Sequence, residues 1–129
     1  MFRSISTIVI AAALAGLLAG PMWAAEPVVS KRLMTENDGL AVFVLEVRGA
    51  DRAIYGMTLV DETGSVMDVV APKGWAGISS GDRVLFSTVD KPVGAGETVA
   101  FRIVTSNKSA PLRVTFRDAK SMVHSKQTI

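Results

Sequence analysis

The sequence predicts a single all-β domain, an antiparallel β-sandwich of seven or eight strands, preceded by a signal-peptide helix. Short runs rich in β-branched and aromatic residues alternate apolar and polar side chains with period two. Clusters of Gly, Asp, Asn, Ser and Pro separate these runs at intervals of roughly 8 to 14 residues, as in sandwiches and small barrels. After residue 25, no stretch sustains the i, i+3, i+4, i+7 apolar stripe of an amphipathic helix.

Residues 1–25 have the layout of a secretory signal peptide. Arg3 supplies a positive start, residues 8–19 are apolar and uncharged, and small residues end the segment. We expect cleavage after Ala24 or Ala25, which leaves residues 26–129 as the mature domain in the periplasm or outside the cell. The alternative is a retained anchor, which needs about 20 apolar residues. The run here is shorter and Gly20-Pro21 interrupts it, so we expect no stable membrane span after cleavage.

Charge and cysteine content limit the function classes. The chain has 14 Lys and Arg, and loss of Arg3 leaves 13 against 12 Asp and Glu. The mature domain is thus nearly neutral, and its arginines are interspersed with acids, whereas nucleic-acid binders carry a basic stripe. We therefore expect no nucleic-acid partner. The absence of cysteine excludes disulfides, thiolate catalysis and thiolate metal sites, so stability must come from packing and strand pairing.

The first half of the domain contains two predicted pairs of strands. Residues 28–34 form the first strand, which ends at the turn formers of residues 36–39, and residues 40–48 form the second. A hairpin with the loop Glu62-Thr63-Gly64 follows, in which Gly64 takes the left-handed conformation that such loops need. Its register places the following residues opposite each other: Asp61 and Ser65, Leu59 and Met67, and Met57 and Val69.

The second half is predicted to contain three or four strands and one long connection. Residues 72–83, with residues 78–82 as loop, carry the chain from one sheet to the other, which favours a sandwich over a barrel. Residues 84–88 and 98–105 are strands, joined by a Pro/Gly-rich connection over residues 90–96. Residues 112–117 alternate most clearly, and residues 122–129 either pair with them across residues 118–121 or fray as a terminus.

One segment supports a resemblance at the level of the fold. Pro72-Lys73-Gly74-Trp75 precedes a strand, a glycine-rich turn follows, and the strand 99–105 comes next. From about residue 40 to residue 118, this arrangement resembles the small immunoglobulin-like or fibronectin-like modules of bacterial exported proteins. The resemblance implies a fold, and such folds host many unrelated functions.

Residue types and spacing argue against several kinds of chemistry. The one histidine, His124, is near Ser121 and Ser125 in the sequence, but no nucleophile-elbow motif or neighbouring carboxylate completes a triad. The acids around Asp61 and Glu62 lack EF-hand spacing, and we expect them to be solvated turn residues. We therefore expect no catalytic residue and no cofactor, although a hydrolase that uses paired carboxylates stays open because twelve acids always allow some such pair.

Two features are candidate binding residues. Trp75, the one tryptophan left after cleavage, is either an anchor for a partner or, as we favour, a plug over the end of the sandwich. Met122 and His124 have the alternate spacing that places two side chains on one face of a strand, and thioether and imidazole ligands suit copper.

The leading hypothesis is an exported, non-enzymatic module that binds or supports another protein of the cell envelope, for which exposed strand edges offer a docking mode. The alternative is a periplasmic protein that binds copper or a small ligand, with Met122 and His124 as metal ligands.

Overall fold

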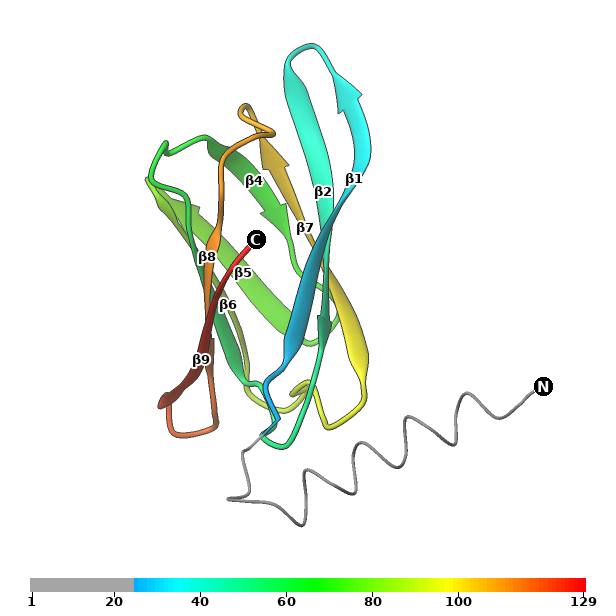
Figure 1. Ribbon diagram of the computed structural model, residues 1–129, viewed down its shortest axis with the longest axis vertical. Helices are drawn as coiled ribbons and strands as arrows, with labels where there is room; N and C mark the ends of the chain where they lie inside the picture. The colour runs from blue at the N-terminus through cyan, green and yellow to red at the C-terminus, as the bar shows by residue number, and fades with distance from the viewer. Residues whose placement is uncertain (1–24) are drawn as a thin grey trace, which may run out of the picture.

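In the computed structural model, residues 25–129 form nine strands in two antiparallel sheets (Figure 1). The first sheet has the order β1-β2-β7-β4, with β1 Val28–Asn37, β2 Leu40–Arg48, β7 Thr98–Thr105 and β4 Val66–Val70. The second has the order β5-β6-β3-β8-β9, with β5 Trp75–Ser80, β6 Arg83–Thr88, β3 Gly56–Val60, β8 Arg113–Arg117 and β9 Val123–Thr128. The predicted signal peptide lies outside the described residues, except for Ala25.

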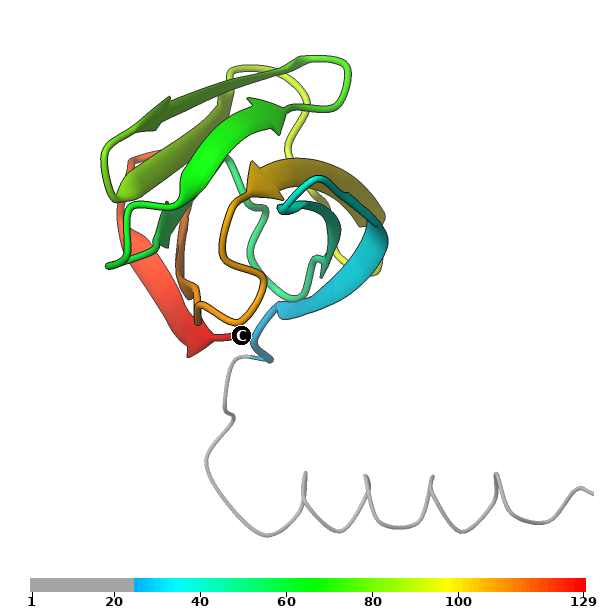
Figure 2. The same cartoon turned by 90° about the horizontal axis from the view of Figure 1, so that it is seen from above.

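The two sheets pack face to face, as the view from above in Figure 2 shows. Buried apolar side chains of both sheets form the core between them. Phe86 of the second sheet meets Phe101 of the first with ring centroids 4.8 Å apart. Leu45 and Phe116 are also fully buried. Burial of such large apolar side chains is the main favourable contribution to folding in a chain without disulfides.

Most of the predicted strands are confirmed. β2 and β7 have the predicted bounds, and Phe101 and Ile103 point into the core as expected. β8 and β9 pair, which was the first of the two alternatives for residues 122–129. The Asp118 carboxylate fixes the turn between them by accepting hydrogen bonds from the backbone N–H groups of Lys120 and Met122, at 2.9 and 3.0 Å.

The ninth strand is β5, and the prediction of a loop over residues 78–82 was wrong for residues 78–80, which belong to this strand, and correct for residues 81–82, which form the turn before β6. Alternation did not indicate a strand because β5 lies at a sheet edge and consists largely of small or exposed residues. Gly77 lets this strand approach β6, since a Cβ atom there would lie 2.8 Å from Cε1 of Phe86. The chain changes sheets before β5, over residues 71–74, and not over the whole of residues 72–83.

The predicted hairpin of residues 57–71 was also wrong. β3 pairs with β6 and β8, whereas β4 pairs with β7 in the other sheet. Leu59 therefore lies opposite Val114, and Met67 is 61% exposed. The residues between the two strands do make a tight turn with Gly64 in the predicted left-handed conformation. That turn joins the two sheets and does not close a hairpin within one of them.

Asp61 stabilises the turn by which the chain crosses from the second sheet to the first. The expectation that Asp61 is a solvated turn residue was wrong. It is 2% exposed, and its Oδ1 accepts hydrogen bonds from the backbone N–H and the hydroxyl of Thr63, at 2.9 and 2.6 Å. Its Oδ2 accepts from the backbone and hydroxyl of Ser65. Burial acts to raise the pKa of Asp61, but the hydrogen bonds from Ser65 and Thr63 outweigh it and hold the pKa below its ordinary value.

We predict that Asp61→Ala lowers the free energy of unfolding by about 2 to 4 kcal/mol, because it leaves buried donors without their acceptor. Chemical denaturation at neutral pH measures this loss. The matched control is Glu62→Ala, which removes an exposed carboxylate from the same turn and should cost no more than about 0.5 kcal/mol. Equal stability of the two variants would contradict the role assigned to Asp61.

Candidate functional site

Trp75 begins β5 and lies half-buried at one end of the core. Its indole N–H donates a hydrogen bond to the backbone carbonyl of Lys91 at 2.8 Å. Its ring stands edge-on to Phe101, with centroids 5.0 Å apart and planes at 87°. The indole is thus engaged on both its polar and its apolar side, as expected of a plug. That Trp75 anchors a binding partner stays a prediction.

Met122 and His124 lie at the turn between β8 and β9. Met122 precedes β9 and is exposed. His124 falls at an irregularity in the pairing of β9 with β8, so the regular alternation that predicted a shared face does not extend over both residues. Within residues 25–129, no three His, Cys, Asp or Glu side chains gather as metal ligands do. A copper site formed by Met122 and His124 stays a prediction.

His124 is half-buried, and its Nε2 atom is buried without a hydrogen-bond partner among the described residues. Burial lowers the pKa of this imidazole, the positive charge of Arg52 lowers it further, and the Asp118 carboxylate opposes both effects.

The β1–β2 hairpin extends beyond the rest of the sandwich (Figure 1). β7 pairs with β2 only from Ala41 onward, so residues 34–40 have no third strand beside them. Asp38 and Gly39 close the hairpin with φ angles of 53° and 78°, the left-handed pair of a tight two-residue turn. Three large apolar side chains are exposed near this tip: Leu33 at 44%, Met34 at 47% and Leu40 at 40%.

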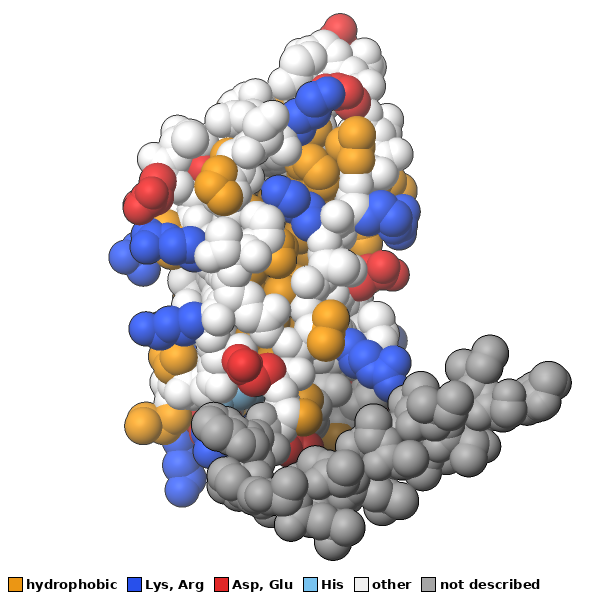
Figure 3. All heavy atoms as spheres, in the orientation of Figure 1, with side chains coloured by type: hydrophobic (Ala, Val, Ile, Leu, Met, Phe, Trp, Pro, Cys, Tyr) orange, Lys and Arg blue, Asp and Glu red, His pale blue; other side chains and the backbone are white. Residues whose placement is uncertain are grey.

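A second candidate surface is the outer face of the sheet β5-β6-β3-β8-β9. The five strands contain four cationic residues and no Asp or Glu: Arg83, Arg113, Arg117 and Lys126. The strands of the other sheet instead carry acids among their cations. Figure 3 shows Lys and Arg side chains projecting on the left of the molecule, where β8 and β9 lie. The formal charge of the domain is therefore unevenly distributed.

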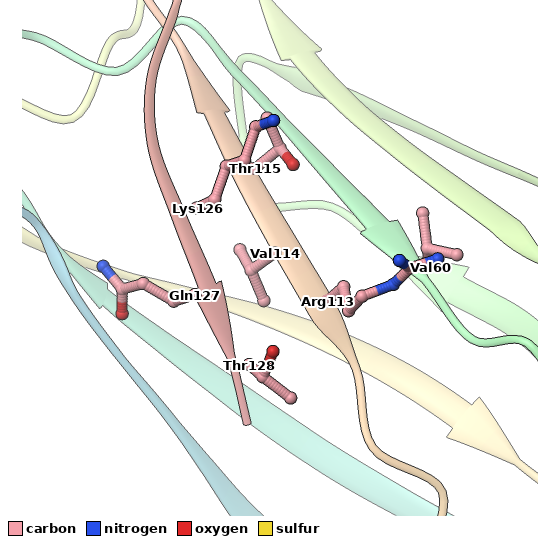
Figure 4. Close-up of a pocket in the computed structure, with 7 residues that line it drawn as sticks. All are labelled: Val60, Arg113, Val114, Thr115, Lys126, Gln127 and Thr128. Carbon is pink, nitrogen blue, oxygen red and sulfur yellow. The ribbon is translucent and has the colours of Figure 1, made fainter.

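The centre of this face is a strip along β8, which we call the cationic track. It consists of the outward side chains of three adjacent strands: Thr58 and Val60 of β3, Arg113, Thr115 and Arg117 of β8, and Lys126 and Thr128 of β9. A shallow pocket of about 370 Å³ lies over one part of it. Figure 4 shows the Arg113 side chain directed toward Val60 and Lys126 beside Thr115.

The track continues into a second hollow of about 650 Å³ near the β8–β9 turn. Its lining includes Tyr55, Ser87, Thr88, Arg117 and Asp118. The Arg117 guanidinium also donates to the hydroxyl of Thr58 at 3.4 Å. Cationic and hydroxyl groups thus follow one another along β8, and the hollow beside Arg117 adds the Asp118 carboxylate and the exposed apolar side chains of Leu85 and Val89.

Sequence reasoning missed this surface. The alternation in residues 112–117 correctly separated Arg113, Thr115 and Arg117 from the core. The signal was the basic-polar-basic order of those three outward residues. Only the pairing of β8 with β3 and β9 shows that Lys126 joins them and that no acid of a neighbouring strand interrupts them.

The comparisons with known proteins identify the fold. No family model and no curated protein matches the sequence. Several solved structures are similar, among them the following three. An uncharacterized protein from Nocardia farcinica, described as having an immunoglobulin-like fold, aligns with a TM-score of 0.56 and 14% identity over 74% of this chain and 80% of that chain.

The other two are parts of carbohydrate-active proteins. A GH20 exo-β-N-acetylglucosaminidase from Vibrio harveyi aligns with a TM-score of 0.53 and 12% identity, over 81% of this chain but 17% of the enzyme. The chitin-binding domain of the hyperthermophilic chitinase from Pyrococcus furiosus aligns with a TM-score of 0.50 and 12% identity, over 82% and 99% of the two chains. At these identities the likeness shows an immunoglobulin-like β-sandwich, as the resemblance implied, and nothing about activity.

We predict that Trp75→Ala lowers the free energy of unfolding by about 3 kcal/mol, because it removes the ring packed on Phe101 and leaves a cavity. Urea denaturation measures the change. Ile78→Ala, an exposed position on the same strand, should change it by less than about 1 kcal/mol. If Trp75→Ala proves as stable as this control, Trp75 is not a plug.

We predict that the protein loses stability as the pH falls through the range in which His124 titrates. The lowered pKa of His124 means that the unfolded chain binds a proton first, near pH 6.5. The contribution of the neutral imidazole is therefore complete above about pH 6.5 and declines as the pH falls toward the lowered native pKa. Denaturation midpoints between pH 8 and pH 5.5 should fall less for His124→Gln than for the wild type. Parallel pH profiles of the two proteins would exclude this role.

Proposed function

We propose that this chain is an exported, non-enzymatic module that binds another protein of the cell envelope, and that the tip of the β1–β2 hairpin is its docking surface. Export rests on the n, h and c regions of residues 1–25 and places the module in the periplasm or outside the cell. Residues 25–129 contain no helix long and apolar enough to span a membrane.

The exposed apolar tip of the hairpin is the observation that carries the proposal. Leu40 lies beyond the part of β2 that pairs with β7, and Leu33 and Met34 lie on the partner strand β1. Folding of this chain leaves each of the three side chains at least 40% exposed. Adaptable Met and branched apolar side chains on a projecting element suit insertion into a hydrophobic groove of a partner. A bulge between Leu33 and Thr35 interrupts the ladder of β1. Side-chain packing therefore fits this tip better than strand addition along the β1 edge.

The described arrangement of Ser and His residues supports a non-enzymatic role. Ser125 donates its hydroxyl hydrogen bond to Glu26 at 2.8 Å and not to His124. Ser121 lies in the β8–β9 turn, where its backbone N–H bonds to the Asp118 carbonyl. Neither serine is therefore held by a base in the geometry that nucleophilic catalysis requires.

The aromatic residues favour a protein over a neutral glycan as the partner. Among residues 25–129, the four phenylalanines are buried and Tyr55 and Trp75 are half-buried. This part of the chain thus presents no fully exposed ring on which a planar ligand face could stack. The chitin-binding function of the Pyrococcus furiosus domain is accordingly not transferred to this chain.

We predict that a photocrosslinking amino acid at Met34 yields one discrete adduct with an envelope protein in cells that produce this chain. The same group at Ala95, which is exposed between β6 and β7, should yield none. The triple variant Leu33→Ser, Met34→Ser, Leu40→Ser should remain folded, because its side chains lie outside the core, and should lose co-purification of the same partner. Identical adducts from both positions, or retention of the partner by the triple variant, would refute docking at the hairpin.

A further inference from the structure

We infer that the cationic track along β8 is a second binding site and that its ligand is an acidic polysaccharide that carries carboxylate groups. This site is separate from the hairpin of the proposed function, because the track lies on the outer face of the other sheet. Each inference can therefore fail without the other.

Charge complementarity is the first argument. Arg113 and Arg117 are four residues apart on β8, about 13 Å at the rise of an extended strand. Lys126 lies opposite Thr115 on the neighbouring strand, about 5 Å from the line between them. Arg83 lies two strands from Arg113, about 10 Å away in the same row. A flat field of spaced cations attracts a polymer with anionic groups at intervals along its length.

The polarity of the track selects the class of polymer. The centre of a protein interface is depleted in charged residues and rich in apolar ones. Here the centre consists of Arg and Lys side chains among Thr hydroxyls, with Val60 as the one apolar outward residue of the seven. Thr58, Thr115 and Thr128 add hydrogen-bonding groups for sugar hydroxyls. A hydrated, hydroxyl-rich polyanion matches this surface better than an acidic protein does.

The same residues argue against nucleic acid. Proteins that bind single strands stack bases on aromatic side chains, and the seven residues of the track include no aromatic ring. Tyr55, in the adjoining hollow, is half-buried. Guanidinium groups bind carboxylates in a bidentate geometry. A uronate-type sugar carries both a carboxylate for the Arg residues of the track and hydroxyls for its Thr residues.

Two acidic residues border the track, Asp118 beside Arg117 and Glu62 beside Arg113, and Glu62 offers an internal control. The Glu62 carboxylate lies 3.0 Å from the Arg113 guanidinium, and both side chains are exposed. A polyanion that binds Arg113 must compete with this weak surface pair. Removal of the Glu62 charge should therefore strengthen binding, an effect that loss of folding cannot produce.

The experiment measures binding of the mature domain to polygalacturonate, with neutral dextran as the control polymer. We expect polygalacturonate binding that weakens about tenfold or more between 50 and 300 mM NaCl, as screened charge contacts require. Arg113→Gln, Arg117→Gln, Lys126→Gln together should weaken binding about tenfold or more at low salt. Arg32→Gln, Arg48→Gln, Arg102→Gln removes the same charge from the other sheet and should leave binding within about twofold.

Four outcomes would overturn the inference. These are equal weakening by the two triple variants, equal binding of dextran, tighter binding of single-stranded DNA or anionic vesicles than of polygalacturonate, and no gain in affinity for Glu62→Gln. A twofold to threefold gain is expected for Glu62→Gln, about the size of one exposed pair.

Discussion

The hydrogen bonds that Thr63 and Ser65 donate to the Asp61 carboxylate determine how the rest of this molecule is assembled. They close a turn in which the chain leaves the second sheet after β3 and enters the first sheet at β4. The crossing is tied to both sheets, because the Asp61 N–H donates to the Asp82 carbonyl and the Ser65 carbonyl accepts from Ser106. A buried carboxylate is tolerated only when its oxygens are bonded in this way.

Both candidate surfaces follow from that crossing. With β3 in the second sheet, its two neighbours are β6 and β8, and the outward residues of these strands form a face whose strands carry no acid. With β4 at the far edge of the first sheet, β2 pairs with β7 and leaves β1 as the other edge. The hairpin tip then projects past the strands that cover its base. The outer face of the second sheet thus presents cations and the tip of the β1–β2 hairpin presents apolar side chains. The two surfaces therefore suit ligands of different chemistry.

The sequence predicted the strands better than it predicted their neighbours. Alternation located β2, β7 and β8 because each buries a row of apolar residues. β9 buries only Ser125, and its pairing was suggested instead by the turn segment of residues 118–121 that precedes it. Alternation missed β5, because Gly77 and the exposed small residues of this strand form no buried apolar row. What defines β5 as a strand is its backbone pairing with β6. The turn chemistry at Gly64 was identified correctly, but the same turn residues serve a hairpin and a sheet crossing. Local sequence could not separate the two, because the difference lies in whether β4, the next strand along the chain, or the distant strands β6 and β8 bond to β3.

For the candidate sites too, the sequence indicated what depends on a single residue and not what depends on the pairing of distant strands. Trp75 was singled out because of its residue type, and the structure adds its bond to the Lys91 carbonyl. A count of charges could not reveal the cationic track, because the total of the domain is nearly neutral whereas the acids and cations are distributed unequally between the two sheets. Arg113 and Lys126 become neighbours only through the pairing of β8 with β9.

Backbone nuclear Overhauser effects between paired strands test the central claim most directly. The crossing at Asp61 predicts cross-strand contacts of Leu59 with Val114 and of Val69 with Ile103. Contacts of Leu59 with Met67, as in a local hairpin, would show that β3 and β4 share a sheet and would contradict the assembly of the outer face described above.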